Sequence, residues 1–334
     1  MTSRNAILAL FSGKKIEPQP AFSGLIHVTA EGLQSEGLVF HEVHKDARQM
    51  ARASASTFKL SGLPSAVAPL DMYVEAEALG AQIDFRKNQG FSFPQIARSM
   101  FASTKYLNRG YFESADFVDK GRIPLVCEAI RYLKEDIGHE AVIGGMIPGP
   151  YTLLLFLMEP GGLFAEMKRE PVAVAEALFQ LASFLAQVGI AYREAGADFI
   201  TIHDMGGSPG FIGPAKYEQF AYPAEKLLIT ELPAPRVLSV CGNTNKSIHL
   251  LVQTSAEAIS VDQLNDLAES RKVLTDTLLF GNTDPVQTLS LGAQHDIQVA
   301  VKSAVRAGVD AVWPGCDLVP QTPIENLKAF VAAS

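Results

Sequence analysis

The sequence predicts an α/β fold of the (β/α)8 type, a TIM barrel, and three observations support this prediction. Short apolar runs alternate with longer helical patterns along the chain, as parallel strands alternate with the helices that cover them. The length of 334 residues suits one such barrel. No Pro/Ser-rich linker interrupts the alternation, so we expect one barrel domain over residues 1–334.

Eight strands and five of the helices can be placed from the residue patterns. The strands are expected at Ala21–Val28, Ala66–Pro69, Val142–Ile147, Asp198–His203, Arg236–Val240, Ala258–Val261, Leu278–Gly281 and Ala311–Pro314. The helices are expected at Pro171–Ala195, Pro214–Leu232, Lys246–Thr254, His295–Ala307 and Thr322–Ala332. Proline stands near several helix starts, where its missing N–H does no harm, and Gly196 and Gly308 follow helices as left-handed caps.

Two segments lie outside this regular alternation. The first residues, MTSRNAILALFSGKK, predict an amphipathic helical extension that ends at Gly13. Residues 85–113 are irregular and rich in aromatic and basic side chains. They are either an excursion over the barrel mouth or a plain surface loop.

Composition and motifs exclude several function classes. With 48% hydrophobic residues, 19% charged residues and a net charge of -8, the chain offers no basic stripe for a nucleic acid. The N-terminal apolar stretch is too short to span a membrane, and three cysteines without a pairing pattern fit a reducing cytoplasm. No Walker or GxSxG motif is present, so we expect neither nucleotide chemistry nor α/β-hydrolase chemistry.

Two cysteines fall where predicted strands end, in RVLSVCGN (Cys241) and DAVWPGC (Cys316). The carboxyl ends of the strands form the rim on which TIM barrels carry their chemistry. Two thiolates that converge there suggest a soft metal ion, most naturally zinc. The alternative is that both thiols are small buried hydrophobic groups, as unpaired cysteines commonly are.

Other polar groups follow the strand ends and are candidates for the same rim. They are Asp71, His203, Asp204, Asn243, Asp262, Asn282, Asp284 and Asp317. Each also fits a structural role: Asn243, Asp262, Asn282 and Asp284 fit turn or helix caps, and His203 fits a hydrogen-bonded core histidine. Their joint occurrence at successive strand ends favours a functional rim.

Four phrases of the sequence carry a family resemblance: PLDMYVEAEALGAQIDF, SVCGNTN, LLFGNTDP and AVWPGCDLVPQTPIENLKAFV. Together they resemble the uroporphyrinogen decarboxylase superfamily, and within it the methylcobamide:coenzyme M methyltransferase branch. The similarity covers nearly the whole chain. It implies a uroporphyrinogen decarboxylase-like barrel that takes a methyl group from a methylcobalamin-type corrinoid, carried by a corrinoid-binding protein, and passes it to an acceptor. The acceptor would be a thiol activated by zinc, or tetrahydrofolate.

The decarboxylase branch of the same superfamily fits this sequence less well. It holds an acidic tetrapyrrole with an arginine-rich N-terminal motif, and the corresponding stretch here, PQPAFSGLIHVTAEGL, contains no arginine. Its pocket tyrosine corresponds to Phe156, and its late histidine corresponds to Cys316. A polycarboxylate without cationic partners would be bound poorly. A relative that binds a corrinoid or another ligand without turnover is a further alternative.

The methyltransferase branch implies the site residues, with one departure. Its zinc site resembles H-x-C plus a later Cys, but the H-x-C stretch here reads Ser239-Val240-Cys241. Cys241 and Cys316 therefore carry over as zinc ligands and catalytic residues, whereas the histidine does not. His203 could supply the missing nitrogen and Asp262 a weaker oxygen ligand, or zinc could be absent. The resemblance also places Asp71 in the catalytic set, and Glu75, Asn243 and Asn282 beside the acceptor or the corrinoid.

Overall fold

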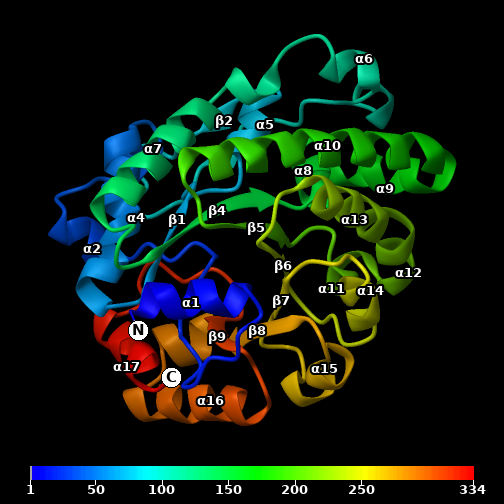
Figure 1. Ribbon diagram of the computed structural model, residues 1–334. Coiled ribbons are helices and arrows are strands. Elements are labelled where there is room, and N and C mark those ends of the chain that lie inside the picture. Colours follow the sequence, from blue (N-terminus) through cyan, green and yellow to red (C-terminus); the bar gives the residue numbers. More distant parts are fainter. Residues whose placement is uncertain (1) are drawn as a thin grey trace.

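The computed structural model describes residues 2–334 and confirms the predicted barrel architecture, with the strands at the centre and helices around them (Figure 1). Seven parallel strands form one sheet in the order β1-β4-β5-β6-β7-β8-β9. They are β1 Ser65–Ala68, β4 Val142–Pro148, β5 Phe199–Asp204, β6 Arg236–Val240, β7 Ala258–Val261, β8 Leu278–Thr283 and β9 Ala311–Pro314. Seven of the eight predicted strands are therefore present, with bounds that differ by two residues or fewer.

The segment predicted as the first strand, Ala21–Val28, is not a regular strand. It nevertheless lies between β9 and β1: the Phe22 N–H donates to the Val312 carbonyl at 3.3 Å, and the Ser23 N–H donates to Ser65 Oγ at 3.0 Å. A Cβ on Gly24 would lie 2.6 Å from the Trp313 ring, so the backbone runs directly against the side chains inside the barrel. Backbone bonds are present on the β9 side, but on the β1 side a bond to a side chain replaces the backbone ladder that the prediction assumed.

Helices precede the first strand of the barrel, connect the later strands and follow the last strand. They are α1 Ser3–Phe11, α2 Ala30–Ser35, α3 Phe40–Val43, α4 Ala47–Ser61, α5 Val74–Ala78, α6 Arg109–Phe112, α7 Ile123–Asp136, α8 Pro150–Leu157, α9 Pro160–Arg169, α10 Pro171–Ala195, α11 Pro209–Ile212, α12 Pro214–Lys216, α13 Tyr222–Glu231, α14 Ile248–Val252, α15 Leu267–Val273, α16 Gln294–Arg306 and α17 Ile324–Ala332. A π-helical stretch, Tyr217–Ala221, joins α12 to α13 inside the predicted helix Pro214–Leu232. Helix α10 has the predicted bounds, because Gly196 with φ of 118° ends it in the left-handed conformation.

Helix α1 closes the N-terminal end of the barrel. Its Ile7 and Leu10 pack in one apolar cluster with residues that begin strands, such as Val142 of β4 and Phe199 of β5. Arg4 binds both carboxylate oxygens of Asp198 at 2.6 and 2.8 Å, which fixes α1 to the segment before β5. This end is filled with side chains, so the opposite end, where the strands finish, is left for function.

The irregular segment near residues 85–113 contributes to the mouth of the barrel. It includes one strand of a short antiparallel pair, β2 Ile83–Asp84 with β3 Gln95–Ile96, and the connection between them carries Phe93. Phe93 packs edge-on against Phe40, with 5.1 Å between the ring centroids, and lines a cavity at the strand ends. The segment therefore contributes an aromatic side chain to the wall of this cavity.

Helix α10 is long and apolar enough to cross a membrane by length and composition. However, 56% of its most apolar window is buried inside the fold, where α10 packs against α7, α8 and α13. Its apolar character is accounted for by these contacts, as in the core helix of a globular protein.

Candidate metal and acceptor site

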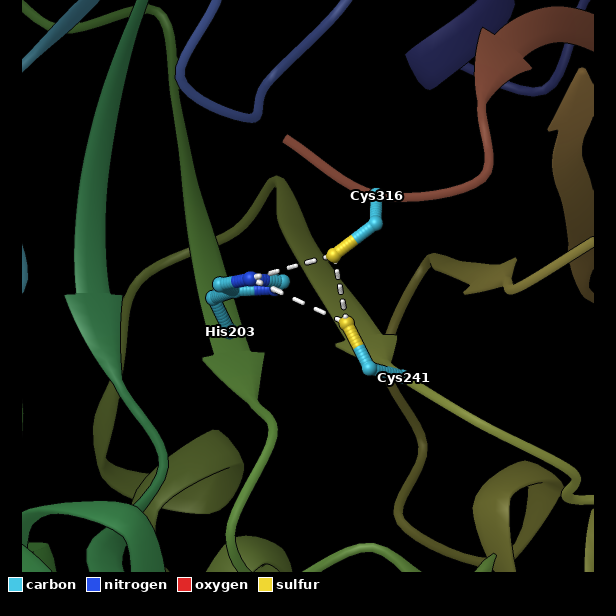
Figure 2. Close-up of side chains that lie close together, drawn as sticks. All are labelled: His203, Cys241 and Cys316. Carbon is cyan, nitrogen blue, oxygen red and sulfur yellow. Dashed lines mark hydrogen bonds between the residues drawn. The ribbon is translucent and has the colours of Figure 1, made fainter. Parts of the chain in front are cut away.

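His203, Cys241 and Cys316 come together at the carboxyl ends of three strands (Figure 2). His203 is the next-to-last residue of β5, Cys241 directly follows β6, and Cys316 follows β9 after one glycine. The two sulfur atoms are 2.9 Å apart, and His203 Nε2 lies 3.9 Å from Cys241 Sγ and 4.0 Å from Cys316 Sγ. The structure therefore brings together three of the four residues predicted as metal ligands.

The local chain path explains why these three side chains meet. The Cys241 N–H donates to the Asp204 carbonyl at 3.1 Å, which holds the ends of β5 and β6 together. The turn that presents Cys316 needs Gly315, because a Cβ there would lie 2.7 Å from the backbone nitrogen of Gln263. Both of these backbone features lie at the carboxyl ends of the strands, where the three side chains meet.

The register of the sheet accounts for the missing histidine of the H-x-C stretch. His203 on β5 pairs directly with Ser239 on β6. Paired residues of neighbouring parallel strands project from the same face and lie about 4.8 Å apart. His203 thus presents its imidazole one strand away from the position where the H-x-C pattern would place it.

The donor set fits a zinc ion. One imidazole and two thiolates form the protein part of a catalytic zinc site, in which a fourth position stays open. Tetrahedral bonds of about 2.3 Å to sulfur separate two sulfurs by about 3.8 Å, and the sulfur–nitrogen separation is about 3.6 Å. The observed separations of 2.9, 3.9 and 4.0 Å bracket these values, so small side-chain rotations suffice to seat the ion.

The three groups perturb one another's protonation. The hydrogen bond from the Cys241 thiol, together with His203 and against the effect of burial, lowers the pKa of Cys316 to about 6. The same contact with Cys316 and burial raise the pKa of Cys241. Burial lowers the pKa of His203, but Asp317 and Cys316 outweigh it and raise it to about 10. One thiolate, on Cys316, is therefore held between a thiol and an imidazolium.

A cavity of about 190 Å³ opens beside this cluster. Its wall is mostly apolar and aromatic, and it consists of Ile26, Asp71, Met72, Tyr73, Phe93, Phe156, Met205 and Asp317. The rings of Tyr73 and Phe156 lie 4.6 Å apart. Asp317 lies both in the cavity wall and beside the three-residue cluster, because its Oδ2 is 3.5 Å from His203 Nε2. The cavity therefore adjoins His203 through Asp317, and it can hold a small molecule, although the two cysteines do not line it.

Asp71, predicted as catalytic, forms the floor of this cavity within a buried ion network. Arg122 donates to both of its oxygens, at 2.6 and 3.1 Å, and His44 Nδ1 lies 2.9 Å from Oδ2. Burial would raise the pKa of Asp71, but Arg122 and His44 hold it well below its usual range. Arg122 also donates to Glu77 at 2.5 Å. Asp71 is thus an ionised carboxylate whose charge is already neutralised.

Glu75 points into the interior instead of the cavity. Its carboxyl is fully buried and accepts a hydrogen bond from the Tyr192 hydroxyl of α10 at 3.2 Å. Burial, with a smaller contribution from the Asp71 charge, raises the pKa of Glu75 to about 8. Glu75 is therefore protonated at neutral pH and lies behind the wall that Asp71 forms.

The remaining predicted residues lie on the rim outside the sulfur cluster. Asn243 Oδ1 accepts from the Asn245 N–H at 3.1 Å, and Asp262 Oδ1 accepts from the Leu264 N–H at 2.9 Å. Asn282 Nδ2 donates to the carbonyls of Asp262 and Asn265 at 3.1 and 2.9 Å. These contacts match the turn-stabilising roles that the sequence also allowed, and Asp262 is not a member of the three-residue cluster.

The comparisons with known proteins agree with this geometry. The profile described as "Uroporphyrinogen decarboxylase (URO-D)" matches residues 2–334. The chain belongs to the uroporphyrinogen decarboxylase family. It is 30% identical to the methylcobamide:CoM methyltransferase MtaA of Methanosarcina barkeri, over 99% of this chain and 97% of that protein. It is 28% identical to the uroporphyrinogen decarboxylase of Myxococcus xanthus, over 89% and 85%. A solved structure titled "methyltransferase from Methanosarcina mazei" superposes with a TM-score of 0.92 at 28% identity, covering 100% of this chain and 98% of that one.

Within the uroporphyrinogen decarboxylase family, the resemblance to the methylcobamide:coenzyme M methyltransferase branch is confirmed. The cavity wall agrees with this branch, since none of its lining residues is an arginine or a lysine. A tetrapyrrole polycarboxylate would find no cationic partner there.

Several residues of the site were not predicted from the sequence. Asp317 was expected on the rim, but its contact with His203 was not predicted. Met205 directly follows Asp204, and Tyr73 lies two residues after Asp71, so both are close to named rim residues. His44 and Arg122 had no such signal, because they lie at helix ends, His44 directly after α3 and Arg122 directly before α7.

Proposed function

We propose that this protein is a corrinoid-dependent methyltransferase that moves a methyl group from a methylated corrinoid, carried by a partner protein, to a small thiol. The observation that carries the proposal is the convergence of His203, Cys241 and Cys316 beside a cavity of about 190 Å³. The names of the relatives support the reaction class, since they include methylcobamide:CoM methyltransferases. We place the protein in the cytoplasm, and we expect one barrel domain over residues 1–334.

His203 Nε2 and the sulfur atoms of Cys241 and Cys316 would hold the zinc ion. When bound, zinc lowers the pKa of a thiol in its open coordination position, so that the acceptor is a thiolate at neutral pH. The burial of His203 and its strand position keep its ring in place. Cys241 and Cys316 are the catalytic residues of this proposal.

The apolar cavity wall orients the acceptor and keeps water away from its sulfur. Tyr73 and Phe156 confine the acceptor on one side and Met205 on another. The Tyr73 N–H donates to Asp71 Oδ1 at 2.9 Å, so Asp71 positions this wall. Asp71 acts through Tyr73 and is a positioning residue.

The transfer itself is a displacement at carbon. The sulfur electron pair of the acceptor forms the new bond to the methyl carbon, and the cobalt–carbon bond of the substrate breaks. The bonding pair stays on cobalt, which leaves the corrinoid as Co(I). The corrinoid must therefore face the open rim, where Asn243 and Asn282 lie. The sequence resemblance predicts that the corrinoid or the acceptor contacts Asn243, Asn282 and Glu75.

The proposal is tested by metal content and by methylcobalamin demethylation. Wild type should carry about one zinc per chain after zinc is supplied, whereas Cys241→Ala/Cys316→Ala and His203→Ala should lose it. Cys127→Ala is the matched control, because Cys127 is buried in α7, apart from the cluster, and the variant should retain zinc. Zinc-loaded wild type should demethylate methylcobalamin with a thiol acceptor, and the two zinc-deficient variants should not.

Other outcomes would contradict parts of the proposal. Demethylation with tetrahydrofolate but with no thiol would replace the acceptor. Full activity without zinc would remove metal activation of the thiol. Corrinoid binding without turnover under any of these conditions would favour the binding-only alternative.

A further inference from the structure

We infer that the acceptor thiol of this protein carries a positive charge, or no charge, at its far end and is not an anionic thiol such as coenzyme M, 2-mercaptoethanesulfonate. This inference rests on the proposed function and concerns the substrate class of the same site. The relatives named as methylcobamide:CoM methyltransferases act, by that name, on a thiol with a sulfonate end. The charges around the cavity of this chain oppose such a ligand.

The charged residues that line the cavity are both acidic. They are Asp71 and Asp317, and the other lining residues are apolar or aromatic. A sulfonate in a partly enclosed apolar cavity needs a cationic or hydrogen-bonding partner, because desolvation of an anion is costly. Among the residues that line this cavity, no side chain is cationic, and the Tyr73 hydroxyl is the one uncharged donor.

Arg122, the nearest candidate cation, is committed to other groups. Its guanidinium donates to Asp71 from both terminal nitrogens and to Glu77 from Nε, and its side chain is only 6% exposed. It lies behind Asp71 and does not line the cavity. Arg122 therefore neutralises Asp71 and offers no donor to a ligand.

The metal cluster supplies no net charge to attract an anion. Two thiolates balance the two charges of a zinc ion, and a neutral imidazole adds none. Of the two lining carboxylates, Asp317 is then the one with no arginine or lysine partner, since Arg122 pairs with Asp71, and its nearest basic group is the His203 imidazole, with 3.5 Å between Oδ2 and Nε2. Asp317 Oδ1 accepts from the Ile26 N–H at 2.8 Å, and the Asp317 side chain is 23% exposed and lines the cavity. The local field at the acceptor is negative.

The aromatic side chains reinforce the same preference. Tyr73, Phe93 and Phe156 contribute three rings to a cavity that also contains a carboxylate. Aromatic faces attract cations, and a group of rings beside a carboxylate is the arrangement that recognises ammonium groups. A small thiol with an ammonium end would place that end between the rings and Asp317.

The test compares three two-carbon thiols that differ in the charge of the far end: 2-mercaptoethylamine, 2-mercaptoethanol and 2-mercaptoethanesulfonate. The rate of methylcobalamin demethylation by the zinc-loaded protein gives kcat/KM for each. The thiols differ in intrinsic reactivity, so the ratio of kcat/KM for 2-mercaptoethylamine to kcat/KM for 2-mercaptoethanesulfonate is compared between proteins. The decisive quantity is this ratio in wild type divided by the same ratio in Asp317→Asn. We expect this quotient to be about tenfold or more, as for one unit charge at close range in a partly exposed site.

Two further variants separate charge from structural damage. Met205→Lys adds a cation to the cavity wall and should shift the ratio toward the sulfonate by a similar factor. Asp276→Asn makes the same charge change on an exposed residue just before β8, at the opposite end of the barrel, and should leave the ratio unchanged. Zinc content is measured for each variant, so that loss of metal is not mistaken for a change of preference.

Binding of the S-methylated products by calorimetry gives a readout that needs no turnover. The ammonium thioether should bind more tightly than the sulfonate thioether to wild type, and this difference should shrink in Asp317→Asn. Fastest turnover with 2-mercaptoethanesulfonate, or ratios equal in wild type and Asp317→Asn, would overturn the inference and leave the proposed function standing. Failure of all three thiols with zinc-loaded protein would overturn both.

Discussion

Replacing Glu75 by glutamine should remove a pH-dependent loss of stability from this barrel. Glu75 is fully buried, and burial raises the pKa of its carboxyl to about 8 from its usual 4.5. A carboxyl with a raised pKa in the folded state binds its proton more tightly there than in the unfolded chain. The stability that it contributes is therefore fully present below pH 4.5 and is lost as the pH rises through 8.

The magnitude follows from the two pKa values. Each pH unit between them is worth about 1.4 kcal/mol, so ionised Glu75 costs the folded state up to about 5 kcal/mol near pH 9. Glutamine has nearly the same shape, carries no charge, and keeps an oxygen that accepts the hydrogen bond of the Tyr192 hydroxyl. At pH 5.5, one unit above the usual pKa of 4.5, the glutamine variant should already be favoured by about 1.4 kcal/mol, and the near-isosteric change itself should alter stability by less than about 1 kcal/mol.

Urea unfolding of both proteins at pH 5.5, 7 and 8.5 measures the effect as a difference between them. Other groups that titrate in this range, and the carboxylate of Asp71 at lower pH, contribute equally to both proteins and cancel. The glutamine variant should gain several kcal/mol over wild type between pH 5.5 and 8.5. Parallel pH profiles for the two proteins would refute the assignment of a buried, protonated carboxyl to Glu75.

Three further predictions concern the cluster and the barrel interior. The variant His203→Ser should lose zinc, whereas the double variant His203→Ser/Ser239→His should retain about one zinc per chain by elemental analysis, because the two positions pair in register. Loss of zinc in both variants would show that a histidine on β6 cannot replace the histidine on β5. Mild oxidation of zinc-free protein should consume two of the three thiols and be reversed by dithiothreitol, since the sulfurs of Cys241 and Cys316 are 2.9 Å apart. Bound zinc should prevent this oxidation. Thiol titration with mass mapping checks the prediction, and oxidation of Cys127 would contradict it. Gly24→Ala should cost more than about 3 kcal/mol in urea unfolding or prevent folding, because its Cβ would lie 2.3 Å from Thr201 Oγ1 and 2.6 Å from Trp313; a wild-type midpoint would show that the backbone there can shift.

The regular part of the barrel could be predicted because its strands are buried on both faces. Continuous apolar runs such as Val142–Pro148 and Ala311–Pro314 stand out from the helical patterns around them. The first predicted strand was wrong for a reason that the pattern does not encode. Residues 21–28 are apolar because they fill the barrel, and Gly24 passes so close to Trp313 that no pleated ladder forms.

The site could be predicted only where its residues follow strand ends. Cys241, Cys316 and His203 share that feature, so the sequence indicated that they could meet. Asp71 shares it as well, but its buried partner Arg122 comes from 51 residues further along and precedes α7. Glu75 lies one helical turn beyond Asp71, and no pattern in the sequence shows that this turn directs it toward Tyr192 and away from the cavity.

The position of His203 shows why a metal site on a parallel barrel need not keep its sequence motif. The rim brings together residues that lie at the same height along the barrel axis on different strands. Whether side chains can share a metal ion depends on this height and not on their order in the sequence. At one height, the residues of two neighbouring strands lie about 4.8 Å apart on the same face, a distance that one imidazole can cover. His203 and Ser239 occupy one such pair, so a histidine on β5 can serve where a motif would place it on β6. The H-x-C pattern alone would leave this chain without a third candidate zinc ligand, whereas the sheet register brings His203 beside the position of Ser239.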